Sequence, residues 1–166
     1  MFKKLFGKKE EAPKEESVFA PMSGELVALE EVPDPVFSQK MMGDGAAIIP
    51  ADGRIVAPVN GEIIQLFHTK HAIGIRSETG MELLVHVGLE TVGMNGEGFE
   101  AHVKEGDKVT AGDLLLTCDL DLINEKASST ITPIVITNGD ILESVEKMDA
   151  MKAEEGKTEI FKVKAK

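Results

Sequence analysis

The sequence predicts an all-β protein, an antiparallel β-sandwich or barrel with one or two short helices. Three observations predict this fold class: short apolar runs separated by turn-forming residues, a ten-residue segment that occurs twice, and a hairpin pattern in the middle of the chain. The composition suits a packed core, because 42% of the 166 residues are hydrophobic and a chain of this length can bury a sizeable core.

Short apolar segments recur from about residue 18 to residue 118. Residues 24–29, 46–50 and 61–66 are examples, and Gly, Pro, Asp and Asn stand between such runs. Frequent short strands with turn residues between them are typical of sandwiches and barrels. The alternation of residues 161–165 predicts a further strand at the end of the chain.

The internal repeat joins residues 20–29, APMSGELVAL, with residues 57–66, APVNGEIIQL. The Ala, Pro, Gly, Glu and final Leu are identical, and three other positions exchange one apolar residue for another. Solenoid architectures need three or more repeats. A unit that is repeated once therefore predicts two similar motifs packed against each other.

Two short helices are expected late in the chain. One covers residues 122–126. The other begins near Asp140, because Asp140 and Glu143 have capping-box spacing. Apolar side chains at 141, 142, 145 and 148 would then share one helical face.

Residues 1–17 predict a flexible charged tail, and residues 18–166 predict a single domain. In the tail, Phe2, Leu5 and Phe6 would share one helical face surrounded by lysines, which is the pattern of a weak membrane-surface anchor. We expect a charged leader instead, because so short a helix is marginal in water. No segment has the pattern of a signal peptide or a membrane span.

The composition also bears on partners and compartment. A net charge of -11 argues against nucleic-acid binding, because phosphate backbones are bound by basic surfaces. Cys118 is the one cysteine, which excludes an intramolecular disulfide and fits a reducing compartment. It ends an apolar segment, so we expect an inert, buried thiol. We expect a cytoplasmic monomer.

The most informative segment is a predicted hairpin between His71 and His86. Residues 77–80 form a four-residue loop between two apolar strands. If Arg76 pairs with Met81, His71 lies directly opposite His86, and such neighbours have Cβ atoms about 4.5 to 5.5 Å apart. This register predicts two imidazoles in one patch of surface, and a slip of one residue would break the arrangement.

Three kinds of site would use such a pair. A zinc site is incomplete, because closed sites have four ligands and catalytic sites three, and no Cys pair, His-x-His or His-Glu-x-x-His is present. General acid–base catalysis would need a substrate pocket that the sequence does not reveal. In nucleophilic catalysis, one largely neutral imidazole attacks phosphorus and the other stabilises the phosphoryl group. Thr69 is placed to hydrogen-bond to the His71 ring.

The chain has no phosphoryl donor chemistry of its own. It contains no Gly-x-x-x-x-Gly-Lys loop and no kinase motif set. The short glycine segments at residues 43–45 and 96–98 predict turns. We expect neither a cofactor nor a metal, so a phosphoryl group on a histidine would come from another protein.

Segments between about residue 18 and residue 163 closely resemble the glucose-family IIA component of the bacterial sugar phosphotransferase system. They are APMSG at 20–24, VPDPVF at 32–37, GDG at 43–45, VAPVNG at 56–61, TKHA at 69–72, LVHVG at 84–88, GEGF at 96–99 and KEG at 104–106. The resemblance implies an antiparallel β-sandwich built from a duplicated half-motif, and a type-1 EIIA domain over residues 18–166.

The resemblance also implies a role for each residue of the site. His86 is expected to be the phosphoacceptor, His71 to support the transfer, and Thr69 to hydrogen-bond at the site. The expected partners are the phosphocarrier HPr as donor and a sugar-specific EIIB domain as acceptor. The identity of the sugar is not implied.

Both partners are expected to dock on an apolar rim formed by Val36 and Phe37, with the acidic residues Asp34 and Glu90 beside it. Family members often have Asp where this chain has Glu90, a difference that bears on partner preference. His68 and His102 match no family role.

Two families of related architecture fit less well. A biotinyl or lipoyl carrier needs a modified Lys in a tight hairpin, whereas Met151 and Lys152 follow a predicted helix. A lysostaphin-type zinc peptidase needs a His-x-His pair, and a single histidine, His86, stands at that position.

Overall fold

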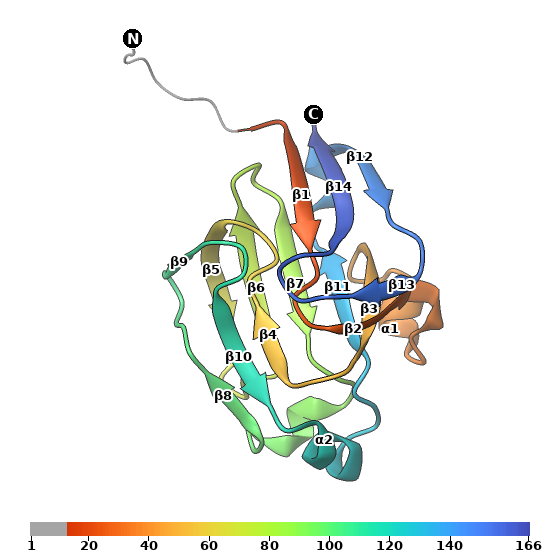
Figure 1. Cartoon of the computed structure of the whole chain (residues 1–166), viewed down its shortest axis with the longest axis vertical. Coiled ribbons are helices and arrows are strands. Elements are labelled where there is room, and N and C mark those ends of the chain that lie inside the picture. The colour runs from red at the N-terminus through yellow and green to blue at the C-terminus, as the bar shows by residue number, and fades with distance from the viewer. Residues whose placement is uncertain (1–12) are drawn as a thin grey trace.

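The computed structural model describes residues 13–166, which form mostly antiparallel β-structure (Figure 1). The strands are β1 (Glu15–Phe19), β2 (Gly24–Ala28), β3 (Asp44–Pro50), β4 (Arg54–Val56), β5 (Gly61–Leu66), β6 (Ala72–Ser77), β7 (Glu82–His86), β8 (Phe99–Ala101), β9 (Lys108–Val109), β10 (Leu114–Cys118), β11 (Thr132–Ile136), β12 (Leu142–Lys147), β13 (Met151–Ala153) and β14 (Glu159–Ala165). The α-helices are α1 (Pro35–Ser38) and α2 (Leu120–Lys126), and the 3₁₀ helices are η1 (Leu29–Glu31), η2 (Thr91–Met94) and η3 (Gly139–Ile141). The predicted fold class is confirmed.

The described strands form three sheets that enclose the main core. The largest has the order β13-β2-β3-β11-β7-β6-β5-β9, and the others are β1-β14-β12 and β4-β10-β8. Fully buried residues of all three sheets belong to one hydrophobic cluster, among them Ile48 and Ile73 of the large sheet, Phe161 of β14 and Leu115 of β10. The sheets are therefore layers around a shared core, as in a sandwich.

A second, smaller cluster lies on the other face of the large sheet. Leu29, Val32 and Phe37 of the η1–α1 segment pack there against residues such as Leu84 of β7. Side chains alternate along a strand, so Leu83 and Val85 face the main core while Leu84 and His86 face this outer cluster. The η1–α1 segment thus covers the part of the sheet beside His86.

Each copy of the repeat accepts a hydrogen bond from the residue just before the other copy. The Phe19 N–H donates to Pro58 O at 2.9 Å, and the Val56 N–H donates to Pro21 O at 2.7 Å. The offset of the sequence repeat relates Phe19 to Val56 and Pro21 to Pro58. The two bonds are thus equivalent under an approximate two-fold relation, which confirms that the two copies pack against each other.

One of the two predicted helices is present. The helix expected at residues 122–126 is α2. The one expected from Asp140 is wrong, because η3 is followed by strand β12. Leu142 pairs with Ala165 and Val145 pairs with Val163, because a bulge between Leu142 and Ser144 inserts one extra residue into β12. Leu142 and Val145 therefore share one face of the strand although they are three positions apart, a spacing that resembles the helical period. Pairing with β14 outweighs the local helix signal.

The predicted hairpin exists, with a register one residue away from the expected one. Arg76 pairs with Glu82 and Ala72 pairs with His86, so His71 is not directly opposite His86. The loop between the strands closes with a hydrogen bond from the Ser77 N–H to Met81 O, 2.8 Å long. This bond continues the register of the strands to Ser77 and Met81, so the loop has three residues, 78–80, rather than the expected four, and the shorter loop accounts for the shift.

Among the described residues, regular structure begins three residues before the expected domain start at residue 18. Strand β1 starts at Glu15 and pairs with β14, so residues 15–17 belong to the sheet. In Figure 1, β1 lies beside β14, and the C-terminus lies at the end of the molecule opposite α2. The anchor pattern of Phe2, Leu5 and Phe6 lies outside the described residues. Within residues 13–166, no helix is long and apolar enough to span a bilayer.

Candidate functional site

His71 and His86 meet at one end of the β6–β7 hairpin. Lys70 has a left-handed φ of 63°, and this turn carries His71 out of the alternation of the strand that follows. The ring centroids of His71 and His86 lie 4.9 Å apart with an interplanar angle of 81°. The Val87 N–H also donates to His71 O at 2.7 Å. The predicted pair is therefore present, although a turn rather than direct cross-strand pairing creates it.

His71 is the buried member of the pair, with 2% of its surface exposed. Its Nδ1 lies 2.6 Å from Thr69 Oγ1, and the Phe67 ring stands edge-on to it at a centroid distance of 5.3 Å. Burial, followed by the neighbouring imidazoles of His86 and His68, lowers the pKa of His71 to about 4. At neutral pH the ring is therefore uncharged and carries one N–H.

His86 is half-buried, and its Nδ1 lies 2.8 Å from Gly88 O. A carbonyl oxygen can only accept, so Nδ1 carries the proton and Nε2 of the neutral ring has a free lone pair. Burial lowers the pKa of His86, while the hydrogen bond to Gly88 opposes this change. His86 thus combines a mostly neutral ring with an available nucleophilic nitrogen.

Gly88 forms the turn that presents its carbonyl to His86. Its φ is +77°, a conformation that L side chains rarely adopt. A Cβ at this position would lie 2.7 Å from Thr91 Cγ2 and 2.9 Å from Ser129 O. Glycine is therefore required both by the backbone conformation and by the close packing of Thr91.

Phe37 lies against His86 and is not part of an exposed rim. Its ring centroid is 5.1 Å from that of His86, and 4% of the residue is exposed. The expectation that Phe37 is an exposed part of the docking rim is therefore wrong. The η1–α1 segment packs this ring into the second, smaller hydrophobic cluster on the outer face of the large sheet. Its neighbour Val36 is 39% exposed.

The two acidic residues expected beside the site differ in their roles. Asp34 caps α1 by accepting a hydrogen bond from the Val36 N–H at 3.0 Å, and its charge acts to raise the pKa of His86. Glu90 is exposed and has a left-handed φ of 62°. Asp34 therefore acts on His86 directly, and Glu90, four residues after His86, is the more exposed of the two.

The described residues offer little for metal or thiol chemistry. No group of three or more His, Cys, Asp or Glu side chains in residues 13–166 is arranged to hold a metal ion. Burial, followed by the charges of Asp119 and Asp52, raises the pKa of Cys118 to about 12. The thiol is therefore protonated at neutral pH and a poor nucleophile.

A family model described as "phosphoenolpyruvate-dependent sugar phosphotransferase system, EIIA 1" matches residues 16–142. The chain belongs to this EIIA family. His71 and His86 both lie inside the matched range, and so does the η1–α1 segment that covers them. The protein is thus a component of the sugar phosphotransferase system, as the sequence resemblance predicted.

Relatives of this EIIA chain extend over its whole length. It is 60% identical over 166 residues to the glucose-specific EIIA component of Bacillus cereus, and the match covers all of both chains. It is 57% identical over 170 residues to the same component of Halalkalibacterium halodurans, covering 99% of this chain and 98% of the relative. The solved structure of glucose permease IIA from Mycoplasma capricolum has a TM-score of 0.82 at 37% identity, and the match covers 93% of this chain and 99% of the other.

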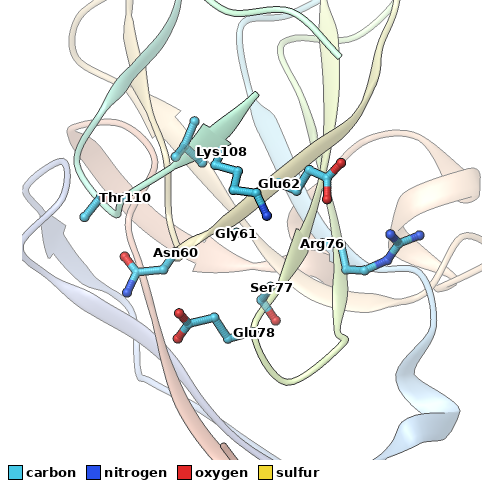
Figure 2. A pocket seen from close by; sticks show the side chains of 9 residues that line it. Asn60, Gly61, Glu62, Arg76, Ser77, Glu78, Lys108 and Thr110 are labelled. Carbon is cyan, nitrogen blue, oxygen red and sulfur yellow. The ribbon is translucent and has the colours of Figure 1, made fainter. Parts of the chain in front are cut away.

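This EIIA chain also has a pocket of about 370 Å³ (Figure 2). It is lined by Asn60, Gly61, Glu62, Arg76, Ser77, Glu78, Lys108, Val109 and Thr110. Strand β6 starts next to His71 and ends at Ser77, so this pocket and the histidine pair lie at opposite ends of the strand. Figure 2 shows charged side chains of both signs around the pocket, which therefore belongs to a different part of the EIIA surface.

Sequence reasoning missed three contributors to this EIIA site. Phe67 contacts the ring of His71, Gly88 accepts from His86 through its main chain, and Thr91 packs against Gly88. Phe67 and Thr91 lie within five residues of a site histidine, but an apolar or hydroxyl side chain at such a distance carries no distinctive pattern. The role of Gly88 depends on a backbone dihedral that the residue type alone does not specify.

Proposed function

We propose that this EIIA component carries a phosphoryl group on Nε2 of His86, taking it from HPr and passing it to a sugar-specific EIIB domain. The hydrogen bond between His86 Nδ1 and Gly88 O carries this proposal. It places the ring proton on Nδ1, so that Nε2 keeps the lone pair that a phosphorus atom must meet.

In the proposed step, the lone pair of His86 Nε2 attacks the phosphorus of a phosphohistidine on HPr. The N–P bond to the donor imidazole breaks as the new N–P bond forms, and the electron pair of the broken bond returns to the donor nitrogen. One N–P bond replaces another, so the step needs no cofactor. Gly88 O continues to accept the Nδ1 proton and stabilises the positive charge that the His86 ring acquires.

His71 complements His86 in this scheme. If the Thr69 hydroxyl donates to Nδ1 of His71, the proton of the neutral ring must lie on Nε2. His71 then presents an N–H next to the lone pair of His86, suited to bind a phosphoryl oxygen. Because the pKa of His71 is about 4, this support comes from a neutral N–H donor at neutral pH.

Exposed apolar residues in α1 and η2, the elements that contact His86 and the Gly88 turn, fit the docking of partner proteins. Val36, in the helix whose Phe37 contacts His86, is 39% exposed, and Val92, in η2, is 57% exposed. Glu90 precedes η2 and adds an exposed carboxylate. We propose that HPr and EIIB use this surface in turn, with Glu90 facing basic groups of the partner.

The relatives suggest the class of sugar. Two of the most similar carry the description "glucose-specific", so we propose that the cognate EIIB belongs to a glucose-type transporter. Pairing the phosphorylated protein with EIIB domains of different sugar classes tests this, and phosphoryl transfer to a glucose-type domain is the expected result. Preference for another class would contradict it.

The phosphohistidine is tested by incubating the protein with HPr, the first enzyme of the system and phosphoenolpyruvate. Acid-labile phosphate should appear on the wild-type protein and be absent from His86→Ala. His102→Ala is the matched control, because His102 is an exposed histidine hydrogen-bonded to Thr117 away from the site. Labelling of His86→Ala at the wild-type level would overturn the proposal.

The supporting role of His71 is tested separately. His71→Gln should accept phosphate from HPr but pass it to EIIB at a rate at least tenfold lower than the wild type. Equal rates of onward transfer in the two proteins would show that His71 has no part in the step.

We further propose that the protein acts in the cytoplasm as a monomer, where phosphoenolpyruvate supplies the phosphoryl group. Light scattering of the phosphorylated and unphosphorylated protein tests the oligomeric state, and a dimer mass would contradict it. Weak membrane association through Phe2, Leu5 and Phe6, the alternative to the expected charged leader, is tested by sedimentation with anionic lipid vesicles.

A further inference from the structure

Thr91 is a fully buried polar residue next to the site that no part of the proposed mechanism uses. It is 0% exposed and opens η2, five residues after His86. Its hydroxyl donates to Val87 O at a distance of 2.7 Å. A buried hydroxyl of this kind orients the peptide group to which it is bound, because breaking the bond would leave an unsatisfied carbonyl.

The methyl group of Thr91 holds the same turn from a second direction. A Cβ added to Gly88 would lie 2.7 Å from Thr91 Cγ2, so this methyl already occupies the space beside the Gly88 Cα. Both branches of the threonine side chain therefore contact the Val87–Gly88 segment. The Val87 N–H is held as well, by the bond to His71 O at 2.7 Å.

This restraint reaches His86 through a single carbonyl. The direction of Val87 O determines the orientation of the Val87–Gly88 peptide plane. Together with the φ of +77° at Gly88, that plane fixes the position of the Gly88 carbonyl carbon, to which the oxygen that faces His86 is bonded. Gly88 O lies 2.8 Å from His86 Nδ1 and selects the tautomer in which Nε2 is unprotonated.

We propose that Thr91 is a positioning residue for phosphoryl transfer, which holds Gly88 O in place and thereby keeps the nucleophilic lone pair on Nε2 of His86. Its effect on transfer rests on the proposed role of His86. Its effect on the tautomer is a property of the unphosphorylated protein and needs no donor.

The test is ¹⁵N NMR of the imidazoles of unphosphorylated protein at a pH where His86 is neutral. The wild type should show His86 with a protonated Nδ1 and an unprotonated Nε2. In Thr91→Val, which keeps the shape and removes the hydroxyl, the fraction with Nε2 protonated should rise at least tenfold. Phosphoryl uptake from HPr should slow about fivefold, and Thr91→Ser should recover the wild-type spectrum.

Thr132→Val is the matched control. Thr132 is also 0% exposed, and its hydroxyl donates to a main-chain carbonyl, Thr130 O, at 3.0 Å. Its substitution should leave the His86 tautomer unchanged. A wild-type His86 spectrum in folded Thr91→Val would overturn the proposal, and so would an equal change in Thr132→Val. If Thr91→Val does not fold, Thr91→Cys gives the same comparison with a weaker donor.

The two readouts separate this proposal from the proposed function. If His86 is not the phosphoacceptor, all variants lack phosphate on His86 while the tautomer change in Thr91→Val is still observed. If Thr91 has no positioning role, the wild-type protein is labelled on His86 and the tautomer stays the same in Thr91→Val.

Discussion

The hydroxyl of Thr69 lies 2.6 Å from Nδ1 of His71, and both groups are buried. If this hydroxyl donates, the proton of the neutral His71 ring lies on Nε2. Gly88 O can only accept, so it places the proton of the neutral His86 ring on Nδ1. The two histidines can therefore present different Nε2 atoms, one as a donor and one as a nucleophile, although they are the same residue type.

Thr69→Val should weaken the support from His71 without removing the phosphoacceptor. A hydrogen bond of this kind contributes about 1 kcal/mol, so we expect onward transfer to EIIB to slow roughly fivefold, with total phosphate uptake on His86 unchanged. Quench-flow transfer assays measure both. Thr117→Val is a fitting control, because it removes a threonine–histidine hydrogen bond, to His102, in another part of the chain. Identical transfer rates for Thr69→Val and the wild type would contradict the tautomer role.

His71 should make folding stability depend on pH in a defined window. The pKa of His71 is about 4 in the folded protein, below the value of about 6.5 of an unfolded histidine. Between these values the unfolded state binds a proton that the folded state does not. The free energy of unfolding should therefore rise with pH from about 4 to about 6.5 and then level off, by about 3 kcal/mol in total for this residue.

Denaturant unfolding at a series of pH values measures this slope. The slope is proportional to the number of protons that the protein takes up on unfolding. In His71→Gln this number should be lower by up to one in the same window, while His102→Gln should keep the wild-type slope. An NMR titration should also show no inflection of His71 between pH 5 and pH 8. A His71 inflection near pH 6.5 would contradict the assigned shift.

Phe37→Ala should act on stability and on His86 together. Removing a buried Phe typically reduces the free energy of unfolding by about 3 to 5 kcal/mol. Because burial lowers the pKa of His86 and Phe37 supplies part of that burial, the pKa of His86 should rise toward its ordinary value. Chemical denaturation and an NMR titration measure the two effects. Val36→Ala, at an exposed neighbour, should change stability by less than about 0.5 kcal/mol.

Gly88→Ala should be more harmful than the same change at another glycine with positive φ. Gly106 has a φ of +94° and nothing within 4 Å of an added Cβ, so Gly106→Ala should show backbone strain alone, about 1 to 2 kcal/mol. At Gly88 the added Cβ also meets Thr91 and Ser129. We expect a clearly larger loss of stability and at least tenfold slower phosphate uptake, measured by thermal unfolding and by labelling. Equal losses at the two positions would contradict the packing role.

The strands and the duplication were predictable because their signals are local. The segments at residues 24–29, 46–50 and 61–66 correspond to β2, β3 and β5. The repeat was visible in the residue identities themselves. Its reciprocal hydrogen bonds required the structure, since a repeat implies related packing but does not say which main-chain groups meet.

The site could be predicted as a pair of histidines but not in its geometry. The expected register would have placed His71 opposite His86, whereas the actual partner of His86 is Ala72. The left-handed turn at Lys70 restores the contact between the rings. A lysine in this conformation has no sequence signal, because the strain it carries is set by the tertiary fold.

The exposure of Phe37 was misjudged for a related reason. Its neighbour Val36 is just as apolar, and the sequence shows no difference between a side chain that covers the sheet and one that faces solvent. The helix α1 is four residues long, too short for a periodic pattern. Asp34 and Pro35 do mark its start, as a capping residue and a proline in the first turn.

The reciprocal bonds between Phe19 and Pro58 and between Val56 and Pro21 have the form of an isologous interface. Two separate copies of a single unit would meet in this way across a two-fold axis, and their association would depend on concentration. Joined in one polypeptide, the halves stay associated at any dilution. Each half can then diverge, and here the second copy of the repeat leads into the hairpin that carries both histidines, while the first leads into the segment that covers them.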